Sequence, residues 1–284
     1  LLSLDAVAIG VFWHLVFTIE FCERVPVVYE VAVIGLSIWL AYSADRLFDS
    51  MRLDRSRPHT LRHRLHYDYR RALLVAWLIA LAIDMFLVVR FASETQLRWG
   101  FAAVTLLMAY VAGVHVPRQG SGWVPKELKA GLVFAFGVSL SAWAESGLEA
   151  SLELCVSTLM AGVLFAANCL IIACWEQDLD LSQGFESWVT QIPAVNRLPL
   201  VIVVVHGVVA MVMLSVGGLP LRVAACLVAS DGLLLVLVLA KRDHRFLGQG
   251  LETRVSRVSP FGLLADAALA GPPAIWVCFS PVVI

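Results

Sequence analysis

Long apolar runs dominate this chain of 284 residues. A transmembrane helix needs roughly 20 mainly apolar residues to cross the hydrocarbon of a bilayer. Nine runs of about that length fit into the sequence, near 1–22, 27–44, 72–89, 99–116, 130–144, 154–175, 198–214, 220–240 and 260–281. We therefore predict an all-α polytopic membrane protein, built as one transmembrane domain over residues 1–284 with a bundle of nine membrane-spanning helices.

The amino-acid composition supports this class independently. Hydrophobic residues make up 60% of the chain and charged residues 15%, with a mean hydropathy of +0.83, whereas a soluble domain carries about 25% charged residues. No run alternates polar and apolar residues over about ten positions, which disfavours a transmembrane barrel. We expect membrane lipids, and no nucleic acid, among the partners of the chain.

Basic residues mark one side of the predicted bundle. Seventeen of the 21 Lys and Arg residues follow the second, fourth, sixth and eighth runs. Because cytoplasmic loops collect Lys and Arg, we place these loops and the N-terminus in the cytoplasm and the C-terminus across a bacterial inner membrane. The chain does not begin with Met, and its first run lacks the flanks of a signal peptide. We expect this run to be a retained helix and the true N-terminus to lie upstream.

Two pairs of carboxylates lie where apolar runs end on the predicted cytoplasmic side. Asp45 and Asp49 follow the second run, and Glu176 and Asp180 follow the sixth. Both pairs have i,i+4 spacing, so each pair shares one face of a helix. Acidic groups at the end of an apolar bundle are costly unless a cation, a partner charge or water receives them. The pairs are therefore the strongest candidates for a functional site.

The surroundings of the first pair suit a hard metal ion and a phosphate. Mg²⁺ takes oxygen ligands, usually one or two carboxylates together with substrate phosphates and water. Arginines follow at 52, 55 and 57, and guanidinium groups match phosphate oxygens. The segment is also compatible with an ordinary helix end whose Asp and Arg residues pair with one another.

At these residues the chain resembles the UbiA superfamily of intramembrane prenyltransferases. Enzymes of that family have an NDxxDxxxD stretch at the end of the second helix and a DxxxD-type stretch at the end of the sixth. The first is matched in register by AYSADRLFD at 41–49, and WEQDLD at 175–180 is similar to the second. The order of elements, with a Lys that opens the fifth helix, is also similar.

The resemblance implies a nine-helix bundle in which two acidic motifs hold Mg²⁺ and an isoprenyl diphosphate above a cavity that opens to lipid. The isoprenyl group would pass from its diphosphate to a lipophilic acceptor. The implied catalytic residues and metal ligands are Asp45, Asp49, Glu176 and Asp180. The implied substrate-binding residues are Tyr42, Arg46, Arg57, Lys126 and Asn168.

The sequence also departs from the family pattern. Ala41 and Tyr42 replace the Asn-Asp that opens the first motif, and Ile172 stands where a further acidic residue would precede Glu176. Fewer ligands would weaken metal binding. The alternative function is therefore a noncatalytic UbiA-like subunit that packs against other membrane proteins in a larger complex, or that holds a lipid or pigment.

Further ionisable and aromatic residues leave other functions open. A transition metal could be bound by His59, His63 and His66, although a basic loop that contacts anionic lipid is the simpler interpretation. Single ionisable residues also fall inside the predicted spans: Asp5, His14, Glu20, Asp84, His206, Asp231 and Asp266. Such groups can move protons or ions, but they show no repeat symmetry between the halves, which disfavours a transporter. Trp175 could shield a developing carbocation through its ring face.

Overall fold

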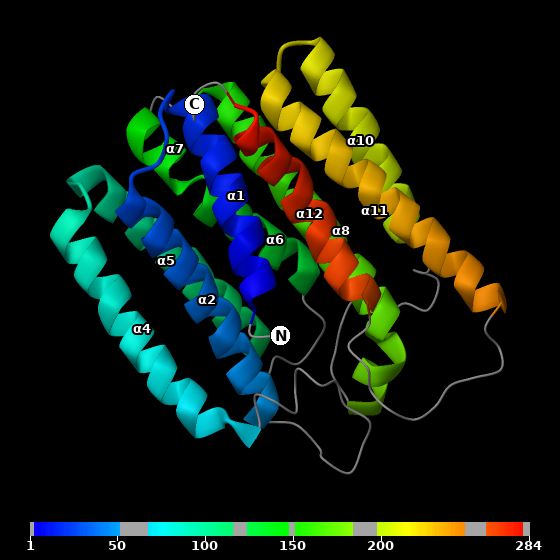
Figure 1. Cartoon of the computed structure of the whole chain (residues 1–284), viewed down its shortest axis with the longest axis horizontal. Helices are drawn as coiled ribbons and strands as arrows, with labels where there is room; N and C mark the ends of the chain where they lie inside the picture. Colours follow the sequence, from blue (N-terminus) through cyan, green and yellow to red (C-terminus); the bar gives the residue numbers. More distant parts are fainter. Residues whose placement is uncertain are drawn as a thin grey trace.

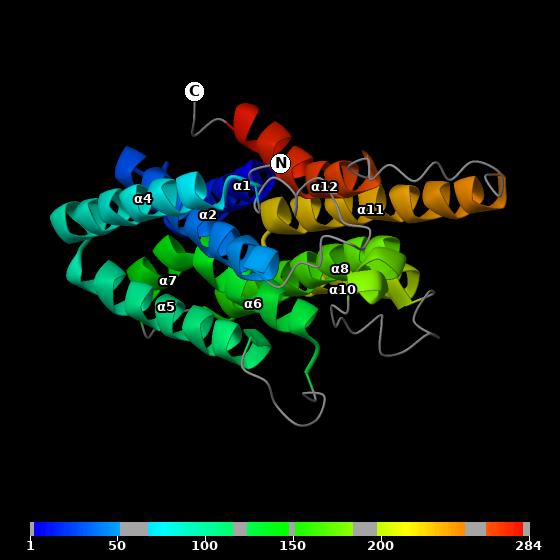
Figure 2. The ribbon, with the colours of Figure 1, turned by 90° about the horizontal axis from the view of Figure 1, so that it is seen from below.

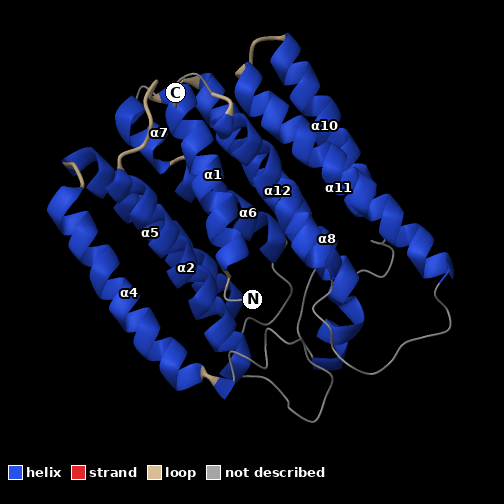
Figure 3. Ribbon diagram, viewed as in Figure 1, coloured by secondary structure: helices blue, strands red, loops and turns tan. Residues whose placement is uncertain are grey.

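The computed structural model describes residues 3–51, 68–115, 124–147, 151–183, 198–247 and 260–280. Within these residues the chain forms ten helices and no strand (Figure 3). The all-α class that the apolar runs predict is therefore confirmed for the described part of the chain.

The helices follow the predicted runs. In chain order they are α1 (Leu4–Phe21), α2 (Val28–Met51), α4 (Arg70–Phe91), α5 (Glu94–His115), α6 (Lys126–Val138), α7 (Leu140–Ser146), α8 (Leu152–Gln183), α10 (Leu198–Ser215), α11 (Leu221–Leu247) and α12 (Pro260–Cys278). The largest differences are at three ends, because α2, α8 and α11 continue past the apolar runs into charged sequence. Helical hydrogen bonds join backbone groups, so a helix does not have to stop where its apolar run stops.

The helices form two layers. Figure 2 shows α4, α2, α1, α12 and α11 in one layer and α5, α6, α8 and α10 in the other. The start of α1 and the end of α12 point toward opposite ends of the bundle (Figure 1). The described turns at 22–27, 92–93 and 216–220 lie at the end where α12 finishes, and we call this the turn end. The opposite end, where α2 and α8 finish, is the carboxylate end.

Within the described residues, fewer helices than the nine predicted are long and apolar enough to cross a membrane. Seven helices are long and apolar enough to cross a membrane, namely α1, α2, α4, α8, α10, α11 and α12. The pair α6 and α7, which meet at an angle of 59°, raises the number to eight if the two form one broken span. Among the described residues, α5 does not meet the same test. The structure supports a polytopic helical membrane protein and does not confirm nine crossings.

The break between α6 and α7 falls at Ser139, inside the short predicted span. Ser139 Oγ donates to the carbonyl of Ala135 at 2.8 Å, and Thr158 Oγ1 on α8 donates to Ser139 Oγ at 3.3 Å. Nδ1 of His14 lies 3.0 Å from the carbonyl oxygen of Val138, and it carries the hydrogen because a carbonyl only accepts. Side chains thus supply hydrogen bonds to backbone groups at the bend, as an irregular backbone inside a membrane requires.

The closest helix pairing joins α6 to α8. A Cβ atom added at Gly131 would lie 2.4 Å from the carbonyl oxygen of Gly162 and 2.5 Å from the backbone nitrogen of Ala166. Small residues let two transmembrane helices approach this closely. The pairing brings the start of α6, with Lys126 and Glu127, against α8.

A cluster of paired polar groups joins several elements at the turn end. Arg24 donates to the Glu30 carboxylate at 2.7 and 2.8 Å, and it also pairs with Glu145 on α7. Glu30 further accepts from Gln96 on α5 at 2.8 Å and from Ser141 on α7 at 3.2 Å. The hydrogen bonds to Glu30, and then those to Glu145, raise the pKa of Arg24 above its ordinary value. We call these five residues the Arg24 cluster.

Candidate functional site

The two acidic helices are longer than the apolar part of the bundle. α8 has 32 residues and α2 has 24. At about 1.5 Å per residue α8 is roughly 48 Å long, whereas the hydrocarbon core of a bilayer is about 30 Å thick. Both helices finish at the carboxylate end (Figure 1). The two carboxylate pairs are therefore carried to the same end of the molecule, as the charge pattern predicts.

Charged side chains from three neighbouring helices lie within electrostatic range of Cys169 on α8. Four of them lie close enough for their charges to act on the Cys169 thiol: Asp266 on α12, Glu127 on α6, and Arg46 and Asp45 on α2. Tyr42 on α2 lies within the same range of Cys169, Asp266 and Arg46. With Asn168, these residues form what we call the Cys169 cluster.

A hydrogen bond between α8 and α12 lies at the inner side of the Cys169 cluster. Nδ2 of Asn168 donates to Oδ1 of Asp266 at 3.1 Å. Asn168 is 5% exposed, and its Oδ1 atom has no hydrogen-bond partner within the described chain. A buried amide oxygen that accepts no hydrogen bond is costly. The cluster therefore contains a polar atom that could accept a hydrogen bond from a bound molecule.

Tyr42 is fixed by packing as well as by charge. Its ring meets the ring of Phe134 edge-on, with the centroids 6.0 Å apart, and it packs against the hydrophobic core of the bundle. Glu127 is 6% exposed. The cluster is thus enclosed by the bundle on one side and reaches the charged helix ends on the other.

The structure brings together only part of the predicted site. Tyr42, Asp45, Arg46 and Asn168 all belong to the Cys169 cluster. Glu176 lies two turns further along α8 and is half-buried, and Lys126 is the first residue of α6, next to Glu127. The remaining predicted side chains lie outside the described residues, namely those of Asp49, Arg57, Asp180, His59, His63 and His66.

Trp175 makes contacts that the sequence did not predict. The Nζ atom of Lys241 on α11 lies 4.7 Å from the centroid of the Trp175 ring, and Phe261 on α12 meets the same ring at 5.7 Å. An ammonium group over an aromatic face is attracted by the ring. Trp175 therefore links α8 to α11 and α12 at the position next to Glu176. The predicted role of Trp175 in shielding a carbocation stays a prediction.

The donor groups present are of the type that Mg²⁺ requires. Asp45 and Glu176, like Glu127 and Asp266, offer carboxylate oxygens, and Mg²⁺ is usually held by one or two carboxylates with substrate oxygens and water. No group of three or more His, Cys, Asp or Glu that could hold a metal occurs among the described side chains, which leave out Asp49 and Asp180. The carboxylate oxygens are thus donors of the type that a magnesium ion accepts.

Besides Cys169 itself, two members of the Cys169 cluster were not predicted as site residues. Glu127 follows Lys126 in the first turn of α6, where an acidic residue is ordinary because it complements the helix dipole. Asp266 stood out as an intramembrane acid, but its partner could not be chosen from sequence. Glu127 and Asp266 can be identified only from tertiary structure, since their position near Cys169 depends on the packing of α6 and α12 against α8.

Most other ionisable residues inside the spans contact a neighbouring element. Asp84 on α4 accepts from Ser37 on α2 at 2.9 Å, and Arg222 on α11 lies 3.4 Å from Glu20 on α1. His206 and Asp231 pair between α10 and α11 at 2.7 Å. These pairs explain how the bundle accommodates polar groups at membrane depth.

Comparison of the chain with protein-family models, with curated proteins and with solved structures finds no match. The resemblance to the UbiA prenyltransferases therefore stays a prediction from the two acidic motifs and the order of the helices.

Proposed function

We propose that this protein is a UbiA-like intramembrane prenyltransferase that moves an isoprenyl group from its diphosphate to a lipophilic acceptor with Mg²⁺. The observation that supports the proposal is the Cys169 cluster, in which Asp45 and Arg46 of the first acidic motif lie within electrostatic range of Cys169 together with Glu127 and Asp266. Asn168 on α8 and Asp266 on α12 are joined by a hydrogen bond. The second motif continues from the same helix, because Glu176 lies two turns after Cys169 on α8.

The division of roles follows from the charges. Asp45, Asp49, Glu176 and Asp180 would hold Mg²⁺, which neutralises charge on the diphosphate when it is bound. Arg46, Arg57 and Lys126 would bind diphosphate oxygens directly. The bond between the first isoprenyl carbon and the diphosphate oxygen would break, and the electron pair would leave with the diphosphate. The acceptor would then form a bond to that carbon and release a proton.

The buried part of the cluster suits the acceptor side of the reaction. Asn168 offers an amide oxygen that has no hydrogen-bond partner within the described chain, and Tyr42 presents a ring that is held by Phe134. An apolar acceptor that entered from lipid would meet these groups before it reached the carboxylate end. Water would be scarce at this position, which strengthens electrostatic interactions with the departing diphosphate.

The direct test is release of diphosphate by the purified protein. We expect Mg²⁺-dependent release from an isoprenyl diphosphate in the presence of membrane-extracted acceptors, and a loss of at least about 100-fold in Asp45→Asn, because a charged ligand to the transition state is removed. Glu94→Gln is the matched control, since Glu94 is an exposed carboxylate on α5 that pairs with Arg98.

Either of two outcomes would contradict the proposal. If no isoprenyl diphosphate supports release above the rate without protein, or if Asp45→Asn and Glu94→Gln have equal activities, the carboxylates do not take part in prenyl transfer.

A noncatalytic UbiA-like subunit in a larger membrane complex is the second candidate. It is favoured by two positions at which the family motifs carry polar residues and this chain carries side chains that pack against the hydrophobic core, Tyr42 and Ile172. Purification from native membranes in a mild detergent distinguishes the two functions. Stoichiometric membrane-protein partners, together with no binding of isoprenyl diphosphate at high Mg²⁺, would favour the subunit.

A further inference from the structure

A buried histidine and a buried aspartate face each other between α10 and α11. Nδ1 of His206 lies 2.7 Å from Oδ2 of Asp231, and Nε2 of His206 lies 2.9 Å from the carbonyl oxygen of Met160 on α8. Because a carbonyl oxygen only accepts, Nε2 carries a hydrogen. The short contact between Nδ1 and Oδ2 also needs a proton, which resides either on the imidazole or on the carboxyl group. In both forms the pair is neutral overall.

The pair lies near the middle of the membrane. Asp231 stands ten residues after the start of α11 at Leu221, which corresponds to about 15 Å along the helix axis. The hydrocarbon core is about 30 Å thick, so Asp231 is roughly halfway through it. At that depth there is no bulk water to complete the hydrogen bonds of a carboxyl group.

One oxygen of Asp231 is left without a partner. The side chain is 5% exposed, and Oδ1 makes no hydrogen bond to the described residues. A buried carboxyl oxygen in this state costs free energy that a hydrogen-bond donor would recover. By contrast, both ring nitrogens of His206 are already in hydrogen bonds. The free capacity of the pair is therefore for one donor, at Oδ1.

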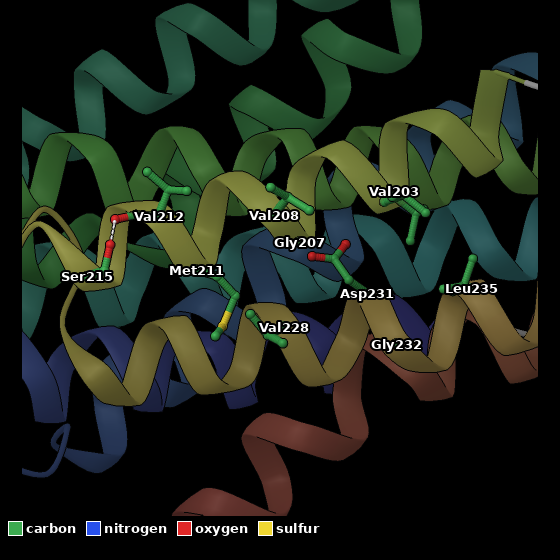
Figure 4. Close-up of a pocket in the computed structure, with 11 residues that line it drawn as sticks. Val203, Gly207, Val208, Met211, Val212, Ser215, Val228, Asp231, Gly232 and Leu235 are labelled. Carbon is green, nitrogen blue, oxygen red and sulfur yellow. Dashed lines mark hydrogen bonds between the residues drawn. The ribbon is translucent and has the colours of Figure 1, made fainter.

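A pocket of about 470 Å³ lies beside this aspartate. The described residues that line it all belong to α10 and α11. They include Met211, Ser215, Val228, Asp231, Gly232 and Leu235. Figure 4 shows the carboxyl group of Asp231 between the two helices, with Met211 and Val228 to one side and Leu235 to the other. Ser215 donates its hydroxyl hydrogen to the carbonyl of Val212 at 2.7 Å. Among the described residues that line the pocket, Asp231 is the one ionisable side chain, and Ser215 is the only other polar side chain.

We propose that this pocket binds a membrane-soluble molecule with an apolar body and a hydroxyl group, and that the hydroxyl donates a hydrogen bond to Oδ1 of Asp231. The lining excludes other ligand classes. A phosphate would be desolvated by valines and would meet a neutral pair whose donors are already in hydrogen bonds, and a metal ion would meet the same neutral pair with a single unoccupied oxygen. The inference is independent of prenyl transfer, since no residue of the two carboxylate pairs lines the pocket.

Photoaffinity labelling in lipid nanodiscs tests the proposal. The probe is dodecanol that carries a diazirine on its chain, and cross-linked peptides are identified by mass spectrometry. We expect saturable labelling of α10 and α11 around Met211. Unlabelled dodecanol should compete at about one tenth of the membrane mole fraction that dodecyl methyl ether needs, because the ether lacks the donor.

Three variants locate the binding to this pocket. A Cβ atom added at Gly232 or at Gly100 would meet no atom within 4 Å, so both glycines tolerate a larger side chain. Gly232→Leu should fill the pocket and abolish the saturable labelling, whereas Gly100→Leu on α5 should leave it unchanged. Asp231→Asn should reduce the tenfold preference for the alcohol over the ether.

The proposal is overturned if the alcohol and the ether compete equally, since the pocket would then hold acyl chains alone. It is also overturned if Gly232→Leu is labelled like the wild-type protein, because the alcohol would then bind elsewhere. Circular dichroism and thermal unfolding of each variant establish that the helices are intact before labelling is compared.

Discussion

The two ends of the bundle use carboxylates in opposite ways. At the turn end, Glu30 accepts hydrogen bonds from Arg24, Gln96, Ser141 and the backbone nitrogen of Val27, so that both of its oxygens are satisfied by the chain. At the carboxylate end, three carboxylates and one guanidinium act on Cys169. The first arrangement consumes its hydrogen-bonding capacity within the fold. The second brings three carboxylates from three helices near one thiol, and under the proposed function Mg²⁺ would bind beside them.

Because of this difference, we expect substitutions at the turn end to change the stability of the fold and substitutions at the carboxylate end to change ligand binding. Removal of a fully satisfied buried carboxylate should destabilise the fold without a specific effect on ligands. Removal of a carboxylate from the carboxylate end should weaken the binding of a cation, because a negatively charged oxygen ligand is lost. Substitutions at each end test whether the turn end serves stability and the carboxylate end serves ligand binding.

The largest effect on stability is expected for Glu30→Ala. The substitution leaves Arg24 without its bidentate partner and removes the acceptor of Gln96 and Ser141. Breaking one partner of a buried ion pair costs about 3–5 kcal/mol. Unfolding of the purified protein in mixed micelles, followed by circular dichroism as the fraction of denaturing detergent rises, measures the loss.

The control for this prediction is Glu94→Ala, which removes an exposed carboxylate from a pair with Arg98 one helical turn away. Such a surface pair contributes about 0.5 kcal/mol or less. Equal destabilisation by Glu30→Ala and Glu94→Ala would show that the Arg24 cluster does not hold the turn end together.

A second substitution tests how the carboxylate end is positioned. Gly131→Ala places a methyl group 2.4 Å from a backbone oxygen of α8, so the helices must separate. We expect a loss of about 1–3 kcal/mol and weaker binding of ligand, since Glu127 and Lys126 move with α6. Gly137→Ala is the matched control in the same helix, because its new Cβ atom would meet nothing within 4 Å. If the two variants unfold alike, α6 and α8 do not pack as described.

A smaller effect is expected for Asn168→Ala. This change removes the donor to Asp266 and also removes the unsatisfied amide oxygen. The two contributions oppose each other, so we expect a loss of only about 1 kcal/mol, measured by the same unfolding experiment. A change above the loss in Glu30→Ala would contradict the division between the two ends.

The smallest effect concerns reactivity rather than folding. Burial, and then the charge of Glu145, raise the pKa of Cys22 to about 12. The thiolate is the reactive form, and a raised pKa keeps the thiol protonated until the pH approaches that value. At pH 8 we expect Cys22 to react with iodoacetamide at least about 100-fold more slowly in the folded protein than in the denatured chain. Equal rates, measured by peptide mapping, would show that Cys22 does not lie in this environment.

The sequence was sufficient to predict the helices but not their partners. Hydropathy locates a helix because burial in lipid depends on the composition of the run itself. The pairing of Asn168 with Asp266 depends instead on the packing of α8 against α12, which no local pattern encodes. The same reason explains why Glu127 was missed, since in sequence it is an ordinary acid in a first helical turn.

One pairing could have been predicted. His206 and Asp231 stand nearly the same number of residues before and after Gly218, in the turn between α10 and α11. Two antiparallel helices joined by a short turn place such positions at the same level. To predict the pair, one would also need to know which face of each helix packs against the other. A pair of polar residues at matched distances from a turn is therefore a useful signal in apolar hairpins.

The most direct test of the account is equilibrium binding of an isoprenyl thiolodiphosphate, which resists cleavage, to the wild-type protein with and without Mg²⁺. We predict tight binding only with Mg²⁺, loss of at least about tenfold in affinity for Asp45→Asn, and unchanged affinity for Glu94→Gln at the turn end. Binding that is independent of Mg²⁺, or equal in Asp45→Asn and Glu94→Gln, would contradict the assignment of the carboxylate end as a cation-dependent diphosphate site.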